Sequence, residues 1–357
     1  MITILYPYRN RELERVKRSL DSLVQQTNRN FKVLFVDYGS KKDIAVKIKP
    51  IVEKYTFCSY YYLYTELQPW NKSKALNFAI KRIKGQYCFV TDVDMIFHPD
   101  FVSILYDKLK FNTVVYFRVG FLSEAESNKN KYFEDYIIKF LSNHEATGLS
   151  LLPVEKLKEI QGFDEFFHFW GAEDTDLHNR LKNSGCEVLY YDEKTLLLHQ
   201  WHTNYRKRET KRLNPELQLT GIVEQNHLHL QHNLMQNKSK VNLDSWGTCM
   251  TETDYVFFKN IPAQLLYNEK SKIDYFLFNV LAYSKNEVIA LRITKIPNTQ
   301  TIKHIIKRFL GKKTVTYYDL KTINDLLLQQ IISYHHHKPY SLEITSDLES
   351  IIFKIKT

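Results

Sequence analysis

The sequence predicts an α/β protein whose N-terminal part is built on a mainly parallel sheet with helices on both faces. Strand and helix patterns alternate through the first 110 of the 357 residues, as they do in chains of βαβ units. The composition fits this class, because 44% of the residues are hydrophobic and 25% are charged, which is ordinary for a globular protein. Open α/β sheets bind ligands where their strands end, so we expect the loops after the strands to carry the chemistry.

The expected elements follow one another at short intervals. In the first half of the chain, strands are expected at residues 2–6, 31–36, 59–64 and 87–90, and helices at residues 12–26, 43–55 and 72–83. Beyond residue 113 the pattern is mixed, with strands expected at 114–119, 188–191 and 196–198 and helices at 153–160 and 174–184. Residues 130–143 are expected to form a loop or helix over the site. Near the C-terminus, the patterns predict strands at 256–258 and 288–291 and a helix at 320–334.

Three regions are expected along the chain: an α/β domain at residues 1–205, a polar helical connection at residues 206–240, and a smaller α+β region at residues 241–357. The net charge of +10 is concentrated near the end, where residues 255–357 hold fifteen Lys and Arg against eight Asp and Glu. Two interpretations stay open: a solvated basic surface, or attraction to an anionic membrane face or acceptor. The basic residues are not interleaved with aromatic ones on a recognisable module, so we expect no nucleic-acid binding.

The sequence predicts neither export nor membrane insertion. No apolar run approaches the ~20 residues of a transmembrane helix, and a strand begins at Ile2 with no signal peptide ahead of it. The four cysteines have neither metal-type nor disulfide-type spacing, which fits a reducing cytosol. We therefore expect a cytoplasmic protein, with peripheral association on the inner face of the membrane as an open alternative.

Two carboxylates follow a buried strand directly. Asp92 and Asp94 come after the apolar run at residues 87–90, and Pro99 stops any continuation. The strand therefore presents both carboxylates at the C-terminal edge of the sheet. Oxygen ligands at such an edge suit a hard cation such as Mg²⁺ or Mn²⁺, which is usually shared with substrate phosphates.

Five segments in order resemble the β-1,4-galactosyltransferase family and its bacterial relatives, which are GT-A glycosyltransferases. The segments are Pro7-Tyr8-Arg9-Asn10-Arg11, Trp70 to Asn77, Thr91-Asp92-Val93-Asp94, Gly148 to Phe163 with Trp170 to Leu181, and His199 to His202. The turn Asp37-Tyr38-Gly39-Ser40 resembles the corresponding turn of family-two glycosyltransferases, a group that includes chondroitin-polymerase-like catalytic domains. The resemblance covers about residues 1–205 and implies a GT-A domain with a Rossmann-like sheet for a nucleotide-diphospho-sugar.

The resemblance also implies the metal ligands. Asp94 would bind Mn²⁺ (or Mg²⁺), with Asp92 nearby for ribose or metal. His199 and His202 match the two ligand positions that follow the family's last strand. On an extended segment these two residues face opposite sides, so both bind only if the chain turns. His202 is the favoured ligand, and one histidine of the pair could instead be a packing residue.

For the transfer itself, the resemblance implies that Asp174 is the general base and that Glu173 hydrogen-bonds sugar hydroxyls. The alternative for this pair is helix capping by acids in a first turn. Trp170 and Phe169 would stack on the apolar face of the acceptor sugar. The donor nucleotide would be held by a larger set of residues, with Asp37 on uracil: Pro7, Tyr8, Arg9, Arg11, Asp37, Trp70, Lys72, Asp92 and Asp94.

Three departures from the family pattern leave the donor sugar open. The family's second glycine before the acid pair is Ala172, and its third acid is Thr175. Where the family has an aromatic residue that helps to set the donor sugar, this chain has Glu145-Ala146-Thr147. Galactose is therefore in doubt, with N-acetylgalactosamine, glucose and N-acetylglucosamine as alternatives. The family's membrane anchor is also absent, which favours a bacterial, cytosolic enzyme.

These observations predict a metal-dependent, inverting hexosyltransferase. It would move a hexose or N-acetylhexosamine from a UDP-sugar to a hydroxyl of a glycan or lipid-linked oligosaccharide, in the synthesis of a bacterial surface polysaccharide such as capsule or lipopolysaccharide. The basic C-terminal region would then provide peripheral membrane association. Two alternatives remain: a metal-dependent phosphoesterase, and a non-catalytic UDP-sugar or carbohydrate binder of the same fold.

Overall fold

The computed structural model describes residues 1–203, 209–296, 306, 309–310 and 315–357. The chain forms two compact units. The N-terminal unit comprises Met1–Glu66, Trp70–Lys207 and Val223–Thr248, and the C-terminal unit comprises Leu67–Pro69, Arg208–Ile222 and Cys249–Thr357. The expected boundary between residues 205 and 206 lies outside the described residues. The units differ from the expected regions, because Val223–Thr248 groups with the N-terminal unit, whereas Leu67–Pro69 and Arg208–Ile222 group with the C-terminal unit.

A seven-stranded sheet forms the centre of the N-terminal unit, with the strand order β10-β6-β9-β4-β1-β2-β3. Neighbouring strands are parallel except at β9, which is antiparallel to both of its neighbours. The bounds are β1 Ile2–Tyr8, β2 Phe31–Asp37, β3 Cys58–Tyr62, β4 Tyr87–Val90, β6 Thr113–Phe117, β9 Ser150–Pro153 and β10 Glu187–Tyr191. The predicted α/β class with a mainly parallel sheet is confirmed.

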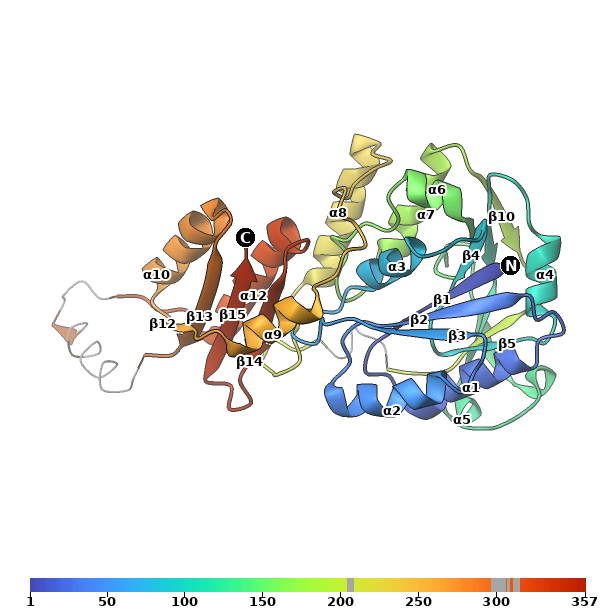
Figure 1. Ribbon diagram of the computed structural model, residues 1–357, viewed down its shortest axis with the longest axis horizontal. Coiled ribbons are helices and arrows are strands. Elements are labelled where there is room, and N and C mark those ends of the chain that lie inside the picture. Colours follow the sequence, from blue (N-terminus) through green and yellow to red (C-terminus); the bar gives the residue numbers. More distant parts are fainter. Residues whose placement is uncertain (204–208, 297–305, 307–308, 311–314) are drawn as a thin grey trace. The chain divides into compact units, whose positions relative to one another are not determined.

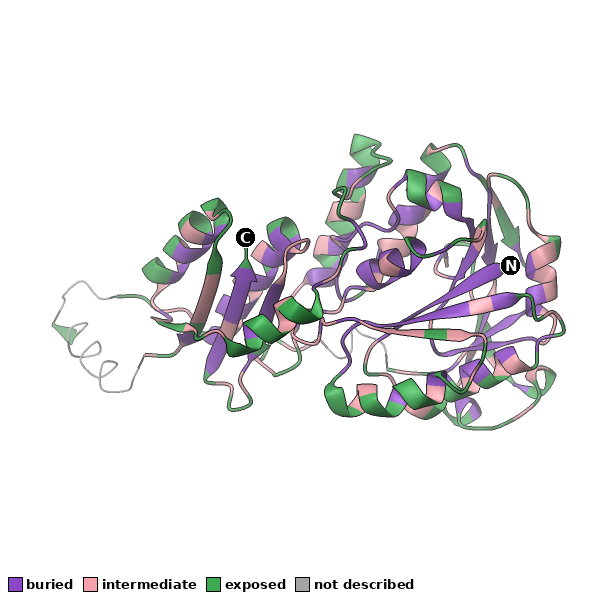
Figure 2. Ribbon diagram, viewed as in Figure 1, coloured by how far each residue is buried: buried purple, intermediate pink, exposed green. Residues whose placement is uncertain are grey.

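Helices cover both faces of this sheet (Figure 1). On one face lie α1 (Leu13–Val24) and α2 (Lys42–Val52); on the other lie α3 (Lys72–Ile80), α6 (Val154–Glu159) and α7 (Glu173–Asn183). All seven residues of β1 are buried for this reason, and Figure 2 shows the central strands as buried. Strands with two covered faces lose their polar alternation, which is why the apolar runs could be assigned as strands.

The N-terminal unit also contains a second, four-stranded sheet in the order β5-β11-β7-β8. Its strands are β5 Met95–Phe97, β7 Val119–Leu122, β8 Ile138–Leu141 and β11 Leu197–His199. The strand expected at 114–119 is thus two strands, β6 and β7, which belong to different sheets. Residues 130–143, expected as a loop or helix, contain the short 3₁₀ turn Phe133–Asp135 and β8. The remaining helices of this unit are α4 Phe101–Asp107, α5 Glu124–Ser127 and α8 Ile222–Gln236.

The C-terminal unit has a mixed sheet in the order β12-β13-β15-β14, in which only the β12–β13 pair is parallel. Its elements are α9 Glu252–Asn260, β12 Gln264–Tyr267, α10 Lys270–Tyr275 with a π-helical turn at Phe276–Leu281, β13 Val288–Thr294, α12 Leu320–Gln330 with a π-helical turn at Ile331–His335, β14 Tyr340–Ile344 and β15 Ser350–Lys356. The segment Leu67–Pro69 joins this unit because the backbone N–H of Leu342 donates to the carbonyl oxygen of Leu67 at 2.7 Å.

The strand expected at residues 256–258 is wrong, because these residues lie within α9. Thr251 caps this helix, with its Oγ1 accepting a hydrogen bond from the backbone N–H of Asp254 at 3.1 Å. Glu252 and Asp254 place negative charge in the first turn, which favours the helix dipole. Capping and first-turn charge thus outweigh the strand preference of the aromatic run. No helix among the described residues is long and apolar enough to cross a membrane.

Gly39, in the turn after β2, supplies a stability prediction. It has φ +67°, and a Cβ there would lie 2.3 Å from the backbone nitrogen of Glu66. We expect Gly39→Ala to lower the free energy of unfolding by about 3 kcal/mol or more, because a left-handed conformation alone costs roughly 1–3 kcal/mol and backbone atoms would have to move as well.

The control is Gly185→Ala, which has φ +84° and no atom within 4 Å of the added Cβ. It should cost only about 1 kcal/mol, from backbone strain. Urea denaturation of both variants measures the difference. Equal losses would contradict the close approach at Gly39.

Candidate functional site

The two predicted histidines and the second aspartate of the Asp-x-Asp motif come together. One ligand atom from each of Asp94, His199 and His202 lies within 4.8 Å of the other two. Nε2 of His199 is 3.7 Å from Oδ1 of Asp94, and Nε2 of His202 is 3.3 Å from Oδ2. The chain turns after β11, so both histidines reach the aspartate.

Strand pairing explains how segments a hundred residues apart meet. His199 ends β11 and pairs with Met95, the first residue of β5, in the antiparallel register. The backbone N–H of Gln200 then donates to the carbonyl oxygen of Asp94 at 3.1 Å. Nδ1 of His202 lies 3.1 Å from the carbonyl oxygen of Thr203, and a proton shared there leaves Nε2 as the lone-pair nitrogen that faces Asp94.

The donor set of this cluster fits a divalent cation. The Asp94 side chain is only 3% exposed, and its Oδ1 has no hydrogen-bond partner within the described part of the chain. A buried carboxylate oxygen without a partner is costly unless a ligand satisfies it. Burial lowers the pKa of His202, although Asp94 opposes the shift. The imidazole is therefore neutral at ordinary pH, which is the form that binds metals.

Lys72 joins the Asp-x-Asp motif to the acid pair of α7. Its Nζ lies 2.9 Å from Oδ1 of Asp92 and 3.6 Å from Oε1 of Glu173. Burial opposes the charge of Lys72, but Asp92 and Glu173 together raise its pKa above the ordinary value. Burial likewise disfavours the charged form of Asp92, and Lys72 reverses this effect, so the pKa of Asp92 is lowered. This interaction holds three separate sequence motifs in one site.

Glu173 and Asp174 begin α7. Burial raises the pKa of Glu173, and Asp174 adds to the shift while Lys72 opposes it. Oδ1 of Asp174 accepts a hydrogen bond from the backbone N–H of Thr175 at 2.9 Å. Oδ2 faces Gly148, where a Cβ would lie 3.2 Å from this oxygen. Ala172, which replaces the family's glycine, has the left-handed φ of +74°.

The two aromatic residues expected to contact an acceptor differ in exposure. Trp170 is 41% exposed, whereas Phe169 is 7% exposed. The backbone N–H of Phe169 donates to the carbonyl oxygen of Trp70 at 2.8 Å, and the Trp70 ring packs edge-on against Tyr38. The Trp70 segment and the segment carrying Trp170 are thus adjacent, and Trp170 is the member that can offer a ring face.

The segment after β1 offers two cations in different surroundings. Pro7 and Tyr8 are buried, and the Tyr8 hydroxyl donates to the carbonyl oxygen of Arg11 at 2.8 Å. Arg9 donates from Nη2 to the carbonyl oxygen of Glu66 at 2.8 Å. Arg11 lies close enough to Asp92 and His202 that its charge contributes to lowering both their pKa values. Arg11 is therefore the residue of this segment that is electrostatically coupled to both Asp92 and the metal cluster.

Asp37 is fully buried, and its side chain is engaged by the protein. Oδ1 accepts from the backbone N–H of Ser40 and Oδ2 from the Tyr60 hydroxyl, each at 2.8 Å. Burial raises its pKa, while these hydrogen bonds and Arg9 oppose the shift. In this structure Asp37 stabilises the turn after β2, and its placement does not by itself provide an exposed group for a nucleotide base.

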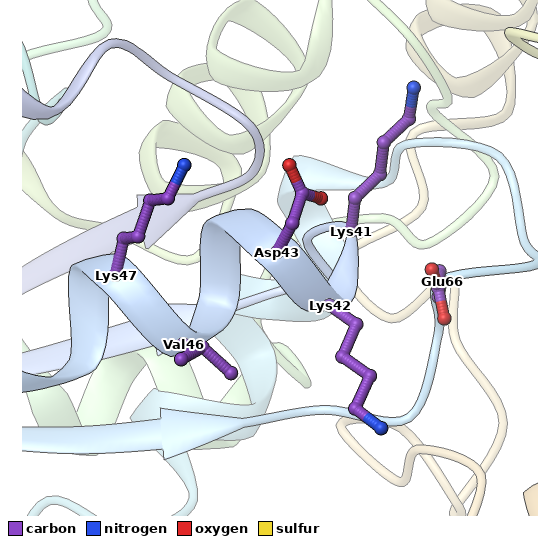
Figure 3. A pocket seen from close by; sticks show the side chains of 6 residues that line it. All are labelled: Lys41, Lys42, Asp43, Val46, Lys47 and Glu66. Atoms are coloured by element: carbon purple, nitrogen blue, oxygen red, sulfur yellow. The ribbon is translucent and has the colours of Figure 1, made fainter.

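A hollow of about 730 Å³ lies at the start of α2 (Figure 3), and Glu66, which accepts the hydrogen bond of Arg9, is among the residues that line it. Figure 3 shows Lys41, Asp43 and Lys47 pointing the same way from the helix, with Val46 on the other side. Its lining contains none of the predicted site residues, and the three lysines that line it are exposed. The convergence of charged groups around Lys72, rather than this hollow, identifies the site.

Sequence reasoning missed the residues that position these groups. Asn71 caps α3, with Oδ1 accepting from the backbone N–H of Lys74 at 2.7 Å, and so fixes the helix that carries Lys72. Asn226 of α8 contacts the segment that carries Trp170. Asparagine is a preferred N-cap residue, so Asn71 had a signal in the sequence, whereas the contact from α8 had none.

Comparison with known proteins finds similarity to glycosyltransferases in the N-terminal part of the chain. Residues 3–157 match the family model "Glycosyl transferase family 2", and residues 130–203 match the model "N-terminal domain of galactosyltransferase". The chain is 27% identical over 136 residues to human β-1,4-galactosyltransferase 5, covering 35% of each protein. It is 25% identical over 143 residues to an uncharacterised glycosyltransferase of Rickettsia felis, covering 40% of this chain and 22% of the relative.

The chain thus spans about a third or less of the length of these relatives. Among solved structures, it is similar to the crystal structure of S. aureus TarS, with a TM-score of 0.45, 16% identity and coverage of 56% of this chain and 36% of that chain. The two matched stretches together contain Lys72, the Asp94 cluster and the acid pair of α7. Residues 3–203 therefore resemble a glycosyltransferase domain of the GT-A fold, with similarity to family two in the first part and to galactosyltransferases in the second.

Proposed function

We propose that this protein is a metal-dependent, inverting glycosyltransferase that moves a hexose or N-acetylhexosamine from a UDP-sugar to a hydroxyl group of a glycan. The observation that carries the proposal is the pair of contacts made by Lys72, which ties Asp92 to Glu173. Asp92 lies two residues before Asp94 of the metal-type cluster, and Glu173 directly precedes Asp174, the candidate general base. The contacts of Lys72 therefore support a single site that contains both the cluster and the base. A phosphoesterase would need neither an acid pair beside the lysine nor an exposed indole such as that of Trp170.

Asp94, His199 and His202 would hold a divalent cation, and the resemblance to the β-1,4-galactosyltransferase family makes Mn²⁺ (or Mg²⁺) our candidate. When bound, a cation of this kind stabilises the charge of a departing diphosphate. Arg11 and Lys72 add fixed positive charge to the same region, which favours the binding of phosphate groups. Asp92 remains ionised beside Lys72 and is available to ribose or to the cation.

Asp174 would act as the general base. As the acceptor oxygen forms its bond to the anomeric carbon, the bond from that carbon to the diphosphate oxygen breaks, and the acceptor proton passes to Asp174. Oδ2 suits this role because Oδ1 already accepts from Thr175. A single displacement of this kind inverts the anomeric configuration. Glu173 would bind a sugar hydroxyl, and Trp170 would stack on the acceptor ring.

The wider setting of the reaction is also part of this proposal. The similarity to an uncharacterised bacterial glycosyltransferase supports a role in bacterial surface polysaccharide synthesis, with a glycan or lipid-linked oligosaccharide as acceptor. The basic excess of residues 255–357 favours peripheral attraction to an anionic membrane face. The family's aromatic residue that helps to set the donor sugar is replaced here by Glu145-Ala146-Thr147, directly before Gly148. We therefore leave the identity of the donor sugar open.

Mn²⁺ should stabilise the protein through the three-residue cluster. At one hundred times its Kd, a bound ion raises the free energy of unfolding by about 2.7 kcal/mol, which thermal unfolding with and without EDTA can measure. Asp94→Asn and His202→Ala should each remove most of this gain. His144→Ala is the control, because this histidine is 63% exposed and outside the cluster. An unchanged gain in Asp94→Asn would rule out this site.

Metal binding should also depend on pH in a defined direction. The ligand histidines must be neutral, and the pKa of His202 is lowered chiefly by burial. His202 is therefore expected to stay available to the metal through the ordinary titration range of histidine, and its contribution to binding should be lost only as the pH falls through its lowered pKa. Titration calorimetry with Mn²⁺ at several pH values measures this, and weakening as the pH rises over the same range would contradict it.

Asp174→Asn tests the reaction itself. A positioned general base contributes roughly 10²–10⁴-fold to the rate, so kcat for transfer should fall by about that factor while Mn²⁺-dependent UDP binding is retained. Asp107→Asn, an exposed change on α4, serves as the control. A panel of UDP-sugars, followed by thermal shift and slow hydrolysis, identifies the donor first. Binding without any turnover would instead indicate a sugar-nucleotide binder, and phosphate release from simple esters would indicate a phosphoesterase.

A further inference from the structure

Asparagine side chains hydrogen-bond the segment that leads to Trp170. They come from α3 and its N-cap, from Asn242 and from α8. Asn71 donates to the carbonyl oxygen of Glu165 at 2.8 Å, and Asn77 donates to that of Phe163 at 2.8 Å. Asn242 also donates to the Phe163 carbonyl oxygen, at 2.6 Å. These contacts hold residues 161–165, whereas the part that carries the exposed indole is held from α8.

One face of α8 supplies three polar contacts at helical spacing. Asn226, His229 and Asn233 lie three and four residues apart and so share a face. Nε2 of His229 is 2.8 Å from Oδ2 of Asp164. Asn233 donates to Asp164 at 3.0 Å and to Oδ1 of Asp176 at 2.9 Å. Because Asp176 belongs to α7, this face ties α8 to the helix that begins with Glu173 and Asp174.

Asn226 makes the contact nearest to the indole. Its side chain is fully buried, and its Nδ2 donates to the carbonyl oxygens of His168 and Trp170, each at 3.0 Å. These two carbonyl groups flank Phe169, whose φ of +63° is in the left-handed region. A single amide group thus closes a turn that a non-glycine residue rarely adopts.

We propose that Asn226 is a positioning residue for the acceptor sugar. It holds the turn at Phe169 so that the exposed face of Trp170 stands in a fixed place relative to the start of α7, to which the same helix is joined through Asn233. The inference rests on the proposed function, because it concerns the acceptor of that reaction. α8 lies outside both stretches that match known family models.

Loss of the Asn226 contacts should therefore affect the acceptor and leave the donor unaffected. Among the described residues, Asn226 makes no hydrogen bond or ion pair with Lys72 or with the Asp94 cluster, so donor binding should not depend on it. Misplacing an acceptor by about 1 Å costs on the order of 10²-fold in rate. The loss should therefore appear in the acceptor KM and in kcat/KM for the acceptor.

The test is Asn226→Asp, which keeps the shape of the side chain and removes both donated hydrogen bonds. We expect the acceptor kcat/KM to fall by roughly 10- to 100-fold, with UDP binding and slow donor hydrolysis unchanged. Hydrogen exchange of the backbone N–H groups at residues 168–172 should become faster, which is a readout independent of activity. Should this variant fail to fold, Asn226→Ser retains one donor and should give a smaller loss.

A pH profile separates positioning from general damage. Burial and two facing carbonyl oxygens raise the pKa of a carboxyl group at position 226, and its protonated form can donate one hydrogen bond. The ratio of variant to wild-type activity should therefore rise as the pH falls. Asn237→Asp, an exposed change at the end of the same helix, is the matched control. Its Oδ1 accepts from Asn183, a role that a carboxylate keeps.

The outcomes distinguish this inference from the proposed function. If the wild-type protein neither hydrolyses nor transfers any UDP-sugar, the proposed function fails, and unchanged hydrogen exchange in Asn226→Asp would additionally overturn the positioning of the turn. If wild-type transfer is seen and Asn226→Asp has the acceptor kcat/KM of Asn237→Asp, the inference alone is overturned. An equal loss of donor hydrolysis and of transfer in Asn226→Asp would also overturn it, because that result indicates general disruption.

Discussion

The site depends on the balance of charge around Lys72. Its ammonium group is 18% exposed and stands between Asp92 and Glu173. Without this cation, two partly enclosed carboxylates would face each other beside Asp174, and burial and mutual repulsion would favour their protonation. The lysine allows acids from the end of β4 and the start of α7 to share one site. Everything proposed for catalysis requires both acids to be near one another and at least partly ionised.

A second constraint is backbone pairing rather than charge. The metal-type cluster forms because β11 pairs with β5 in a register that places His199 opposite Met95. A shift of one residue in that register would turn His199 to the other face of the small sheet. Three strands that contribute only three or four residues each therefore determine whether Asp94 has imidazole neighbours. This small sheet contributes few core residues, but its strand pairing sets the positions of the metal-type ligands.

The sequence was informative where local physics decides the structure. Apolar runs such as Tyr87–Val90 predicted strands because both faces of the central sheet are covered, and the ends of those strands led to Asp92 and Asp94. The histidines were identified as candidate ligands through the family resemblance, but the turn that brings both to Asp94 depends on a pairing between distant strands. The role of Asn226 could not be predicted, because it is one amide among many polar residues of α8. Its hydrogen bonds go to the carbonyl oxygens of His168 and Trp170, which precede it by about sixty residues. The helix at Glu252–Asn260 was missed because its aromatic residues favour a strand, whereas the N-cap at Thr251 stabilises a helix.

The segment Leu67–Pro69 has a consequence for how the gene product can be divided. These three residues group with the C-terminal unit, while Glu66 before them and Trp70 after them group with the N-terminal unit. The carbonyl oxygen of Leu67 and the amide of Gln68 are satisfied by Leu342 and Tyr340 of β14. The two units therefore cannot be separated by a single cut in the chain. A fragment that ended at Thr248 would keep the whole matched glycosyltransferase region and yet leave a polar loop, directly ahead of Trp70, without the strand that satisfies it.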